Sequence, residues 1–390
     1  MPIINRFAEF SDEVAAWRRD IHENPEILYE VHRTAAVVAE KLKEFGVDEV
    51  VTGIGRTGVV GVIKGRETGS GRVIGLRADM DALPIHEATG APHASKTPDA
   101  MHACGHDGHT AMLLGAAKYL AETRNFDGAV ALIFQPAEEG GAGAKEMVDD
   151  GMMERFGVQE VYGMHNMPGM ALGTFEIRSG PVMAATDEFS ITVTGYGGHA
   201  AKPHHAVDAT LVAAQILLTL QTIVARNVDP IESAILSVTT LNAGKAFNVI
   251  PETATLGGTV RTLKPEIRDL MEKRIGEVAE MTAKAFGATA ETDYRRHCPV
   301  VVNHDEQTAF AASVAAGIVG EDQVVRDTPQ IMGGEDFAFM LEARPGAFIF
   351  AGQGDTAPLH HPKYDFNDEL IPLGCSYWAK LVETAMPLAR

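Results

Sequence analysis

The strongest constraint on the fold is a repeated alternation between short apolar segments and longer stretches with helical spacing. The segments VIGLRAD (73–79) and AVALIFQ (129–135) are apolar runs that end on polar residues, as is typical of strands buried on both faces of a parallel sheet. Residues 31–45 and 109–123 place apolar side chains three or four positions apart, which predicts helices. This alternation predicts an α/β fold, with a mainly parallel sheet flanked by helices.

A block in the middle of the chain follows a different order of elements. Two predicted helices, at 206–226 and 265–286, alternate with four predicted strands in the order β-α-β-β-α-β. This order is the ferredoxin-like, or split βαβ, arrangement. We therefore expect an α/β domain in two pieces, residues 1–186 and 297–390, with an inserted α+β domain at residues 187–296.

The composition of the 390 residues argues against several classes of partner. The chain has 33 basic and 53 acidic side chains and a net charge of −20, whereas binding to nucleic acids or anionic membranes needs a basic surface. No apolar run reaches the ~18 residues that span a bilayer, and the N-terminal segment is charged where a signal peptide needs an apolar core. Three cysteines without a CxxC pair do not indicate a disulfide framework. We expect a cytoplasmic protein without nucleic-acid or membrane partners.

Polar side chains capable of metal binding or proton transfer follow several predicted strands. Sites in open α/β sheets form beyond the carboxyl ends of the strands, so we expect these segments to meet at one edge. A further cluster, MHACGHDGHT (101–110), leads into the helix predicted at 109–123. The candidates at strand ends are Asp79, Asp81, Glu138, Glu139, His165, His360 and His361, and the further cluster supplies His102, Cys104, His106, Asp107 and His109.

Cysteine, histidine and carboxylate side chains together are the donor set of Zn, Mn, Co or Ni ions. Cys104 and His106 stand two apart in a glycine-bearing turn, so both can bind one centre. Of the adjacent glutamates 138 and 139, one can bind metal while the other takes a proton from a water of lowered pKa. Any one of these residues alone would be an ordinary hydrogen-bonded side chain, but together they predict a metal site.

Two other patterns point to different chemistry. The glycines of GIGRTG (53–58) fit GxGxxG, but a strand rather than a helix follows them, so we expect a hairpin turn and no dinucleotide site. Cys104 beside His106 could act as a nucleophile. A cysteine nucleophile would leave the glutamate pair and His165 unexplained, so the metal site is the preferred interpretation.

Short segments spread almost end to end carry a family resemblance. They are HENPE (22–26), LRADMDALP (76–84), MHACGHDGHTA (101–111), QPAEEGGAGA (135–144), GMHN (163–166), GGHAAKPH (197–204), NVIPE (248–252), GTVRT (258–262), GGEDF (333–337) and LHHPKYDFND (359–368). MHACGHD together with PAEEG is highly specific. On these segments the chain resembles the metal-dependent amidohydrolases that include hippurate hydrolase, N-acyl-amino-acid aminoacylases and plant auxin–amino-acid conjugate hydrolases, which are related to the di-zinc carboxypeptidases.

The resemblance implies a zinc-exopeptidase-like catalytic domain with two divalent metal ions, Zn, Mn, Co or Ni, per subunit. Cys104 would be a bridging thiolate, and Glu138 would be the base that activates water and later protonates the leaving amine. Asp81, Asp79 and Asp107 would orient ligands. The implied metal ligands are Cys104, His106, Glu139, His165 and His360.

The resemblance also implies that residues 187–296 form a lid and dimerisation module, in a homodimer or homotetramer. His199 resembles a histidine that relatives place across a dimer interface to stabilise the oxyanion; the alternative is a plain turn histidine. Asn248 and Arg261 resemble residues that bind the substrate carboxylate, for which a guanidinium fork is suited; a structural salt bridge is the alternative for Arg261. The residues without an assigned role are Glu335, Asp336 and His361.

The activity implied by the resemblance is hydrolysis of the amide bond of a small N-acyl amino acid, hippurate-like or N-acetyl. A dipeptidase or carboxypeptidase, or an N-acetyl-diaminopimelate-type deacetylase, would share the metal site, so the motifs do not separate these activities. A non-catalytic metal-binding relative is a further alternative. A binding module has no need of a general base such as Glu138 beside a full ligand set, which argues against that alternative.

Overall fold

The computed structural model describes residues 5–389, which form two compact units. The first unit contains the chain up to Gly180, residues 302–329 and the chain from Asp336 onward, and the second contains Pro181–Val301 and Gln330–Glu335. The division into functional domains predicted from the sequence, with an inserted domain at residues 187–296, stays a prediction.

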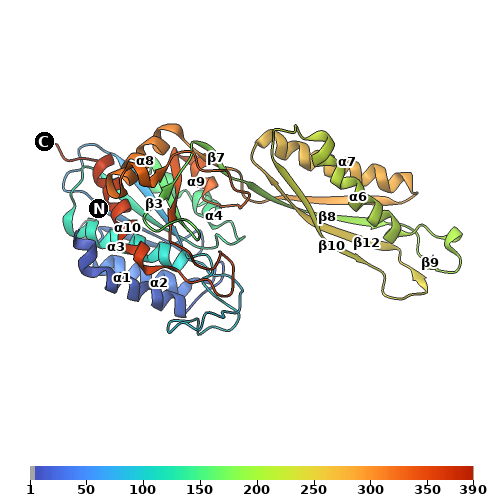
Figure 1. Cartoon of the computed structure of the whole chain (residues 1–390), viewed down its shortest axis with the longest axis horizontal. Coiled ribbons are helices and arrows are strands. Elements are labelled where there is room, and N and C mark those ends of the chain that lie inside the picture. Colours follow the sequence, from blue (N-terminus) through green and yellow to red (C-terminus); the bar gives the residue numbers. More distant parts are fainter. Residues whose placement is uncertain (1–4, 390) are drawn as a thin grey trace. The chain divides into compact units, whose positions relative to one another are not determined.

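The first unit, which contains β3 (Figure 1), is built on an eight-stranded sheet. The strand order is β1-β2-β4-β3-β5-β16-β6-β15. The central strands β4, β3, β5 and β16 are parallel, and β2 and β6 flank them in antiparallel pairs. The strands are β1 (Glu49–Ile54), β2 (Gly58–Lys64), β3 (Val73–Asp79), β4 (Ala129–Gln135), β5 (Glu160–Met167), β6 (Phe175–Glu176), β15 (Val324–Val325) and β16 (Gly346–Gly352). The predicted mainly parallel α/β sheet is confirmed, and β1 and β2 form the hairpin expected around the glycines of residues 53–58.

The helix α3 (His106–Thr123) is buried on nearly all sides, where it contacts β3, α1 and α10. It begins at His106 rather than at residue 109 as predicted. The prediction began too late because Gly105 and Gly108 lower the helix propensity of this stretch. The other helical segments of this unit are α1 (Asn5–Glu23), α2 (His32–Glu44), α4 (Gly143–Asp149), α5 (Met152–Arg155), α8 (Asp305–Val319), η2 (Glu321–Gln323), α9 (Ala338–Ala343), η3 (Asp368–Leu370) and α10 (Ile371–Ala385).

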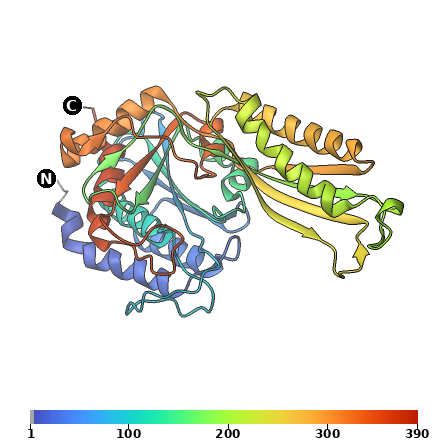
Figure 2. The same cartoon turned by 45° about the vertical axis from the view of Figure 1, so that its right-hand side comes forward.

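The second unit has a four-stranded antiparallel sheet in the order β10-β12-β8-β13. The helices α6 and α7 lie side by side over one face of it (Figures 1 and 2), and their buried side chains share one core with inward residues of the strands. The chain order β8-α6-β10-β12-α7-β13 is the predicted ferredoxin-like order. The elements are β8 (Ala185–Thr194), α6 (Ala209–Asn227), β10 (Ala234–Ala243), β12 (Thr253–Thr262), α7 (Pro265–Ala285) and β13 (Thr289–Arg296), with the short β9 (Gly198–His199), η1 (Pro203–His205) and β11 (Val249–Ile250). The short strands β7 (Gly180–Met183) and β14 (Val301–Asn303) pair with each other where the chain passes between the two units.

Within residues 5–389, α6 is the one helix long and apolar enough to cross a membrane by length and composition, with a mean hydropathy of 1.5. Gln215 and Gln221 interrupt its apolar residues, and Ile216 and Leu220 are buried in the core of the second unit. One helix of this kind is weak support for a membrane span, because core helices have the same composition.

A buried ion pair joins the second unit's sheet to α7. The Nε of Arg268 donates to both carboxylate oxygens of Asp187 at 3.0 Å, and the Tyr294 hydroxyl donates to the same carboxylate at 2.7 Å. Asp187 is 1% exposed, so its charge depends on these donors.

We expect Arg268→Met to destabilise the second unit by about 3–5 kcal/mol, because it leaves a buried carboxylate without its cation. The matched control is Arg296→Met, which removes an exposed pair with Asp269 and Glu272 and should cost about 1 kcal/mol or less. Native-state hydrogen exchange of the β8 amides measures both losses. Equal losses in the two variants would contradict the importance assigned to the buried pair.

Candidate metal centre

The parallel strands of the first unit bring several polar segments to one edge of the sheet. β3 leads into residues 79–81, β4 into the glutamate pair 138–139, and β16 into the loop that carries His360. His165 lies within β5, and the segment 104–106 enters α3 at the same place. This edge is where ligand sites form in open α/β sheets.

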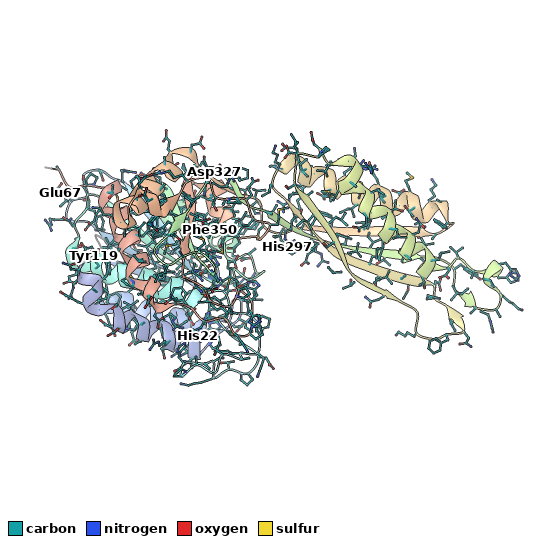
Figure 3. The ribbon with its side chains drawn as sticks, viewed as in Figure 1. His22, Glu67, Tyr119, His297, Asp327 and Phe350 are labelled. Atoms are coloured by element: carbon teal, nitrogen blue, oxygen red, sulfur yellow. The ribbon has the colours of Figure 1, made fainter. Side chains whose placement is uncertain are left out.

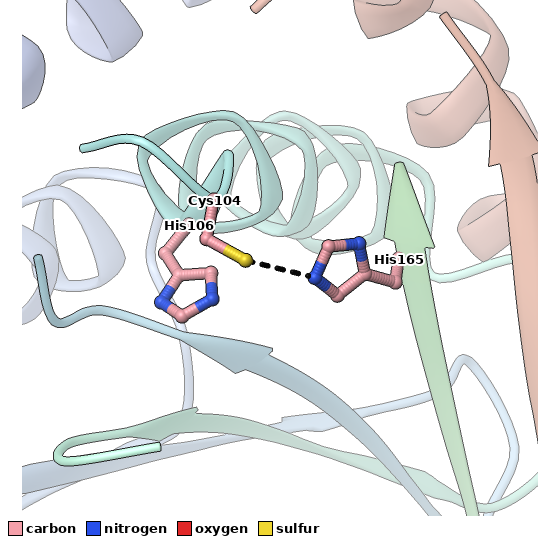
Figure 4. Close-up of side chains that lie close together, drawn as sticks. All are labelled: Cys104, His106 and His165. Carbon is pink, nitrogen blue, oxygen red and sulfur yellow. Dashed lines mark hydrogen bonds between the residues drawn. The ribbon is translucent and has the colours of Figure 1, made fainter. Parts of the chain in front are cut away.

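Cys104 is common to two groups of side chains whose potential ligand atoms lie within 4.8 Å of one another. In the first group its Sγ lies 3.4 Å from Nε2 of His165, with His106 beside it (Figure 4). In the second group, Nε2 of His360 lies 3.3 Å from Oε1 of Glu139. The structure thus brings together all five residues that the resemblance implies as metal ligands.

The histidine rings are oriented so that Nε2 is the atom available to a metal ion. Nδ1 of His106 donates to the carbonyl oxygen of Asp81 at 2.8 Å, and Nδ1 of His165 donates to that of Asn166 at 2.6 Å. A carbonyl oxygen only accepts, so Nδ1 carries a proton in both rings. Nε2 of His106 and Oε1 of Glu139 are buried and make no hydrogen bond with any residue that the structure describes. These atoms fit a divalent cation, which would provide the missing partner.

Asp81 fixes both the glutamate pair and His106. Its carboxylate accepts hydrogen bonds from the backbone N–H groups of Glu138, at 2.9 Å, and Glu139, at 3.1 Å. Its own carbonyl oxygen is the acceptor for His106. Ala137, just before the pair, has a φ of +54°, a strained conformation for a residue with a Cβ, so the turn depends on such bonds.

Asp79 is linked to Asn166, the neighbour of His165, through His109, a residue that received no role from the sequence. One carboxylate oxygen lies 2.6 Å from Nδ1 of His109, and the other accepts from Nη1 of Arg77 at 2.8 Å. Nε2 of His109 accepts from the backbone N–H of Asn166 at 3.1 Å. The sequence feature that could have revealed this role is the position of His109, three residues after His106 on the same helix.

Asp336, whose role sequence reasoning also missed, fastens the loop that carries the glutamates. One of its carboxylate oxygens accepts from Nε2 of Gln135 at 2.7 Å and from Arg77 at 3.2 Å, and the other accepts from the Ala144 N–H at 2.9 Å. These bonds join the end of β4 to the start of α4 on either side of the loop. The neighbouring Glu335 belongs to the second unit.

The buried charges favour a positive charge in the pocket. Burial lowers the pKa of His106, but the charges of Asp79 and Cys104 and the hydrogen bond to Asp81 together outweigh burial and raise it well above its usual value. Burial, aided by His109, holds the pKa of His165 well below its usual range. Burial and the charge of Glu139 raise the pKa of Cys104 to about 12. A thiol of this kind is a poor nucleophile, which weakens the alternative of a cysteine-dependent hydrolase.

The remaining candidates lie elsewhere. His199 and Asn248 are exposed in the second unit and line a hollow of about 470 Å³ beside the β9–β11 pair. Arg261 lies on β12, where its Nη1 donates to the Thr259 hydroxyl and the Val260 carbonyl oxygen, and no carboxylate of residues 5–389 pairs with it. The salt bridge considered for Arg261 is therefore absent from the described part of the chain.

Two further histidine candidates belong to the first unit. Nδ1 of the exposed His361 accepts from the N–H of Lys363. Both ring nitrogens of the buried His102, two residues before Cys104, make no hydrogen bond with described residues.

The comparisons with known proteins agree with this geometry. The sequence profile of peptidase family M20/M25/M40 matches residues 75–384. The hippurate hydrolase of Campylobacter jejuni is 45% identical over 381 residues, 98% of this chain and 98% of that protein. The N-acetylcysteine deacetylase of Bacillus subtilis is 40% identical over 95% of this chain and 96% of that protein. The solved structure of the Bacillus subtilis YXEP protein, named a dinuclear metal-binding peptidase of the M20 family, has a TM-score of 0.85 and 37% identity, and covers 97% of this chain and 99% of its own.

A second buried cluster of charged groups surrounds His22 on α1 (Figure 3). Nδ1 of His22 lies 2.9 Å from Oδ2 of Asp107, and Nε2 lies 3.4 Å from a carboxylate oxygen of Glu87. Burial lowers the pKa of His22, but the charge and hydrogen bond of Asp107, with the bond to Glu87, outweigh burial and raise it to about 9. The other titratable groups that face it are Arg18, His93 and His102.

We expect this histidine to make the stability of the metal-free protein depend on pH. Its pKa is about 9 in the folded state and about 6.5 in the unfolded state, so its contribution is fully present below pH 6.5 and is lost as the pH rises through 9. The loss is about 3 kcal/mol. Urea unfolding of the wild type and His22→Gln, with chelator, measures the difference between the two curves. Parallel curves from pH 6 to 10 would show that His22 is not charged in the folded protein.

Proposed function

The chain belongs to peptidase family M20/M25/M40, and from this premise we propose that it hydrolyses the amide bond of N-acyl amino acids, releasing a carboxylic acid and a free amino acid. The observation that carries the proposal is Cys104, shared by two groups of metal-ligating side chains beside the glutamate pair 138–139. The relatives are named as a hippurate hydrolase and an N-acetylcysteine deacetylase, and both names describe hydrolysis of such an amide. This chain is a hydrolase of the same family.

The chain's own residues divide the work of hydrolysis. Divalent metal ions, when bound, lower the pKa of water and polarise a carbonyl group. Glu138, whose Oε2 lies 4.0 Å from Nε2 of His106, takes the proton of the attacking water and delivers it to the departing nitrogen. Glu139 would be the metal ligand of the pair, as the family resemblance implies, and its Oε1 lies 3.3 Å from Nε2 of His360.

The second unit supplies the remaining substrate contacts in this proposal. Arg261 has no carboxylate partner among the described residues, which leaves N–H donors for a substrate carboxylate. Asn248 would bind the same carboxylate, and His199 beside it in the 470 Å³ hollow would donate to the developing oxyanion. These three assignments come from the family resemblance.

The proposal also covers the number of metal ions in each subunit and the oligomeric state of the protein. The two groups that share Cys104 support two divalent ions per subunit. Their mixed sulfur, nitrogen and oxygen donors suit Zn, Mn, Co or Ni. A homodimer or homotetramer would form through the second unit, where Leu211 and Leu218 on α6 and Phe247 are exposed apolar side chains. Cytoplasmic location stays a prediction.

We expect release of free amino acid from N-benzoyl or N-acetyl amino acids, lost with a chelator and restored by Mn, Zn, Co or Ni. The panel includes indole-3-acetyl amino acids and dipeptides, and chromatographic detection of the released amino acid measures turnover. Cleavage of dipeptides alone would favour the dipeptidase alternative. A metal-loaded protein that cleaves no amide in the panel would contradict the proposal.

The two glutamates should behave differently when each is changed to glutamine. Glu138→Gln should retain metal, measured by elemental analysis, but lower kcat by about 10²–10⁴-fold, because general acid–base catalysis is lost. Glu139→Gln should lose metal affinity. The matched control is Glu146→Gln on α4, whose carboxylate pairs with Arg56 at 3.0 Å, and its kcat should stay at the wild-type value. Near-normal turnover in Glu138→Gln would contradict its role as the base.

A further inference from the structure

Arg18, on α1, is a fully buried cation that contacts no proposed metal ligand. Its side chain is 1% exposed, which is unusual for arginine unless it is paired. Nε donates to Asp368 at 2.8 Å, and Nη1 donates to Asp107 at 3.3 Å and lies 3.5 Å from Asp365. One guanidinium therefore joins carboxylates from two distant segments of the chain.

Each of these segments lies close to a proposed metal ligand in the sequence. Asp107 directly follows His106 in the first turn of α3, and the 365–368 segment follows His360 along the same loop. The two neighbours on α3 point in different directions: Nδ1 of His106 bonds to the main chain of Asp81, whereas Asp107 bonds to α1. Asp107 thus connects the start of α3 to Arg18 and leaves the imidazole of His106 facing the metal pocket.

The two segments are packed against each other without spare room. A Cβ on Gly108 would lie 2.2 Å from the ring of Phe366, and one on Gly105 would lie 2.6 Å from the hydroxyl of Tyr364. The N–H of His360 also donates to the carbonyl oxygen of Ala103 at 2.8 Å. A small shift of either segment would therefore change the distances among the ligand atoms.

Without Arg18, Asp107 and Asp368 would lose the cation that pairs with both, although Asp107 would keep His22 and Asp368 would keep Arg19. Asp107 is fully buried, and repulsion between carboxylates is strong where water does not screen it. The remaining partners pair with one segment each, His22 with Asp107 and Arg19 and His93 with the 365–368 segment, so we expect the two segments to shift relative to each other.

We propose that Arg18 is a positioning residue of the metal centre, which sets the spacing of His106 and His360 by pairing with Asp107 and Asp368. This inference rests on the proposed function, because it presumes that these histidines bind metal. Groups that support metal ligands from outside commonly change metal affinity by about 10–100-fold when they are removed.

The test compares Arg18→Met with Arg19→Met in the full chain. Arg19 is 52% exposed and donates to the same Asp368 at 2.9 Å, but it does not reach Asp107. Titration with Co²⁺ against a competing chelator gives the affinity, and the visible absorption of bound Co²⁺ reports the ligand geometry. We expect Arg18→Met to bind about tenfold or more weakly with an altered spectrum, and Arg19→Met to match the wild type.

A wild-type affinity and spectrum in Arg18→Met, or the same loss in Arg19→Met, would overturn the inference. Arg18→Lys covers the case in which Arg18→Met does not fold, because one ammonium keeps the charge but cannot pair with both carboxylates in the same geometry. An intermediate affinity in Arg18→Lys supports the inference, and an unchanged affinity overturns it. A wild-type protein that binds no Co²⁺ would contradict the proposed function itself.

Discussion

The parallel direction of β4, β3, β5 and β16 is the constraint on which the candidate centre depends. Parallel strands end at the same edge of a sheet, so the polar segments that follow them are brought together although they lie far apart in sequence. The edge gathers a thiol, imidazoles and carboxylates of the first unit within a few ångströms. Reversal of any one of these strands would carry its ligand to the opposite edge.

Carboxylates outside the centre give these ligands their orientation. Asp81 accepts from the main chain of both glutamates, Asp79 is linked through His109 to Asn166 beside His165, and Asp336 fastens the glutamate loop. All three are at most 1% exposed, and a buried charge is tolerated only where donors surround it. The same donors that stabilise these charges therefore determine where the metal ligands point.

The sequence was sufficient to predict the sheet, the inserted α+β block and the set of residues at the strand ends, because these depend on local periodicity and on the rule for parallel strands. It did not reveal the roles of Asp336, which bonds to Gln135 across 201 positions, or of Arg18, which bonds to Asp368 across 350. Such pairs depend on tertiary contacts that leave no local pattern. The start of α3 was missed because its two glycines mask a helix that packing stabilises.

The most direct test of the two-metal centre is anomalous diffraction from crystals of the Mn²⁺-loaded protein. We predict two anomalous peaks, both adjacent to Sγ of Cys104, one beside His106 and His165 and the other beside Glu139 and His360. A single peak, or peaks away from the Cys104 sulfur, would contradict the assignment of Cys104 as the ligand shared by both ions.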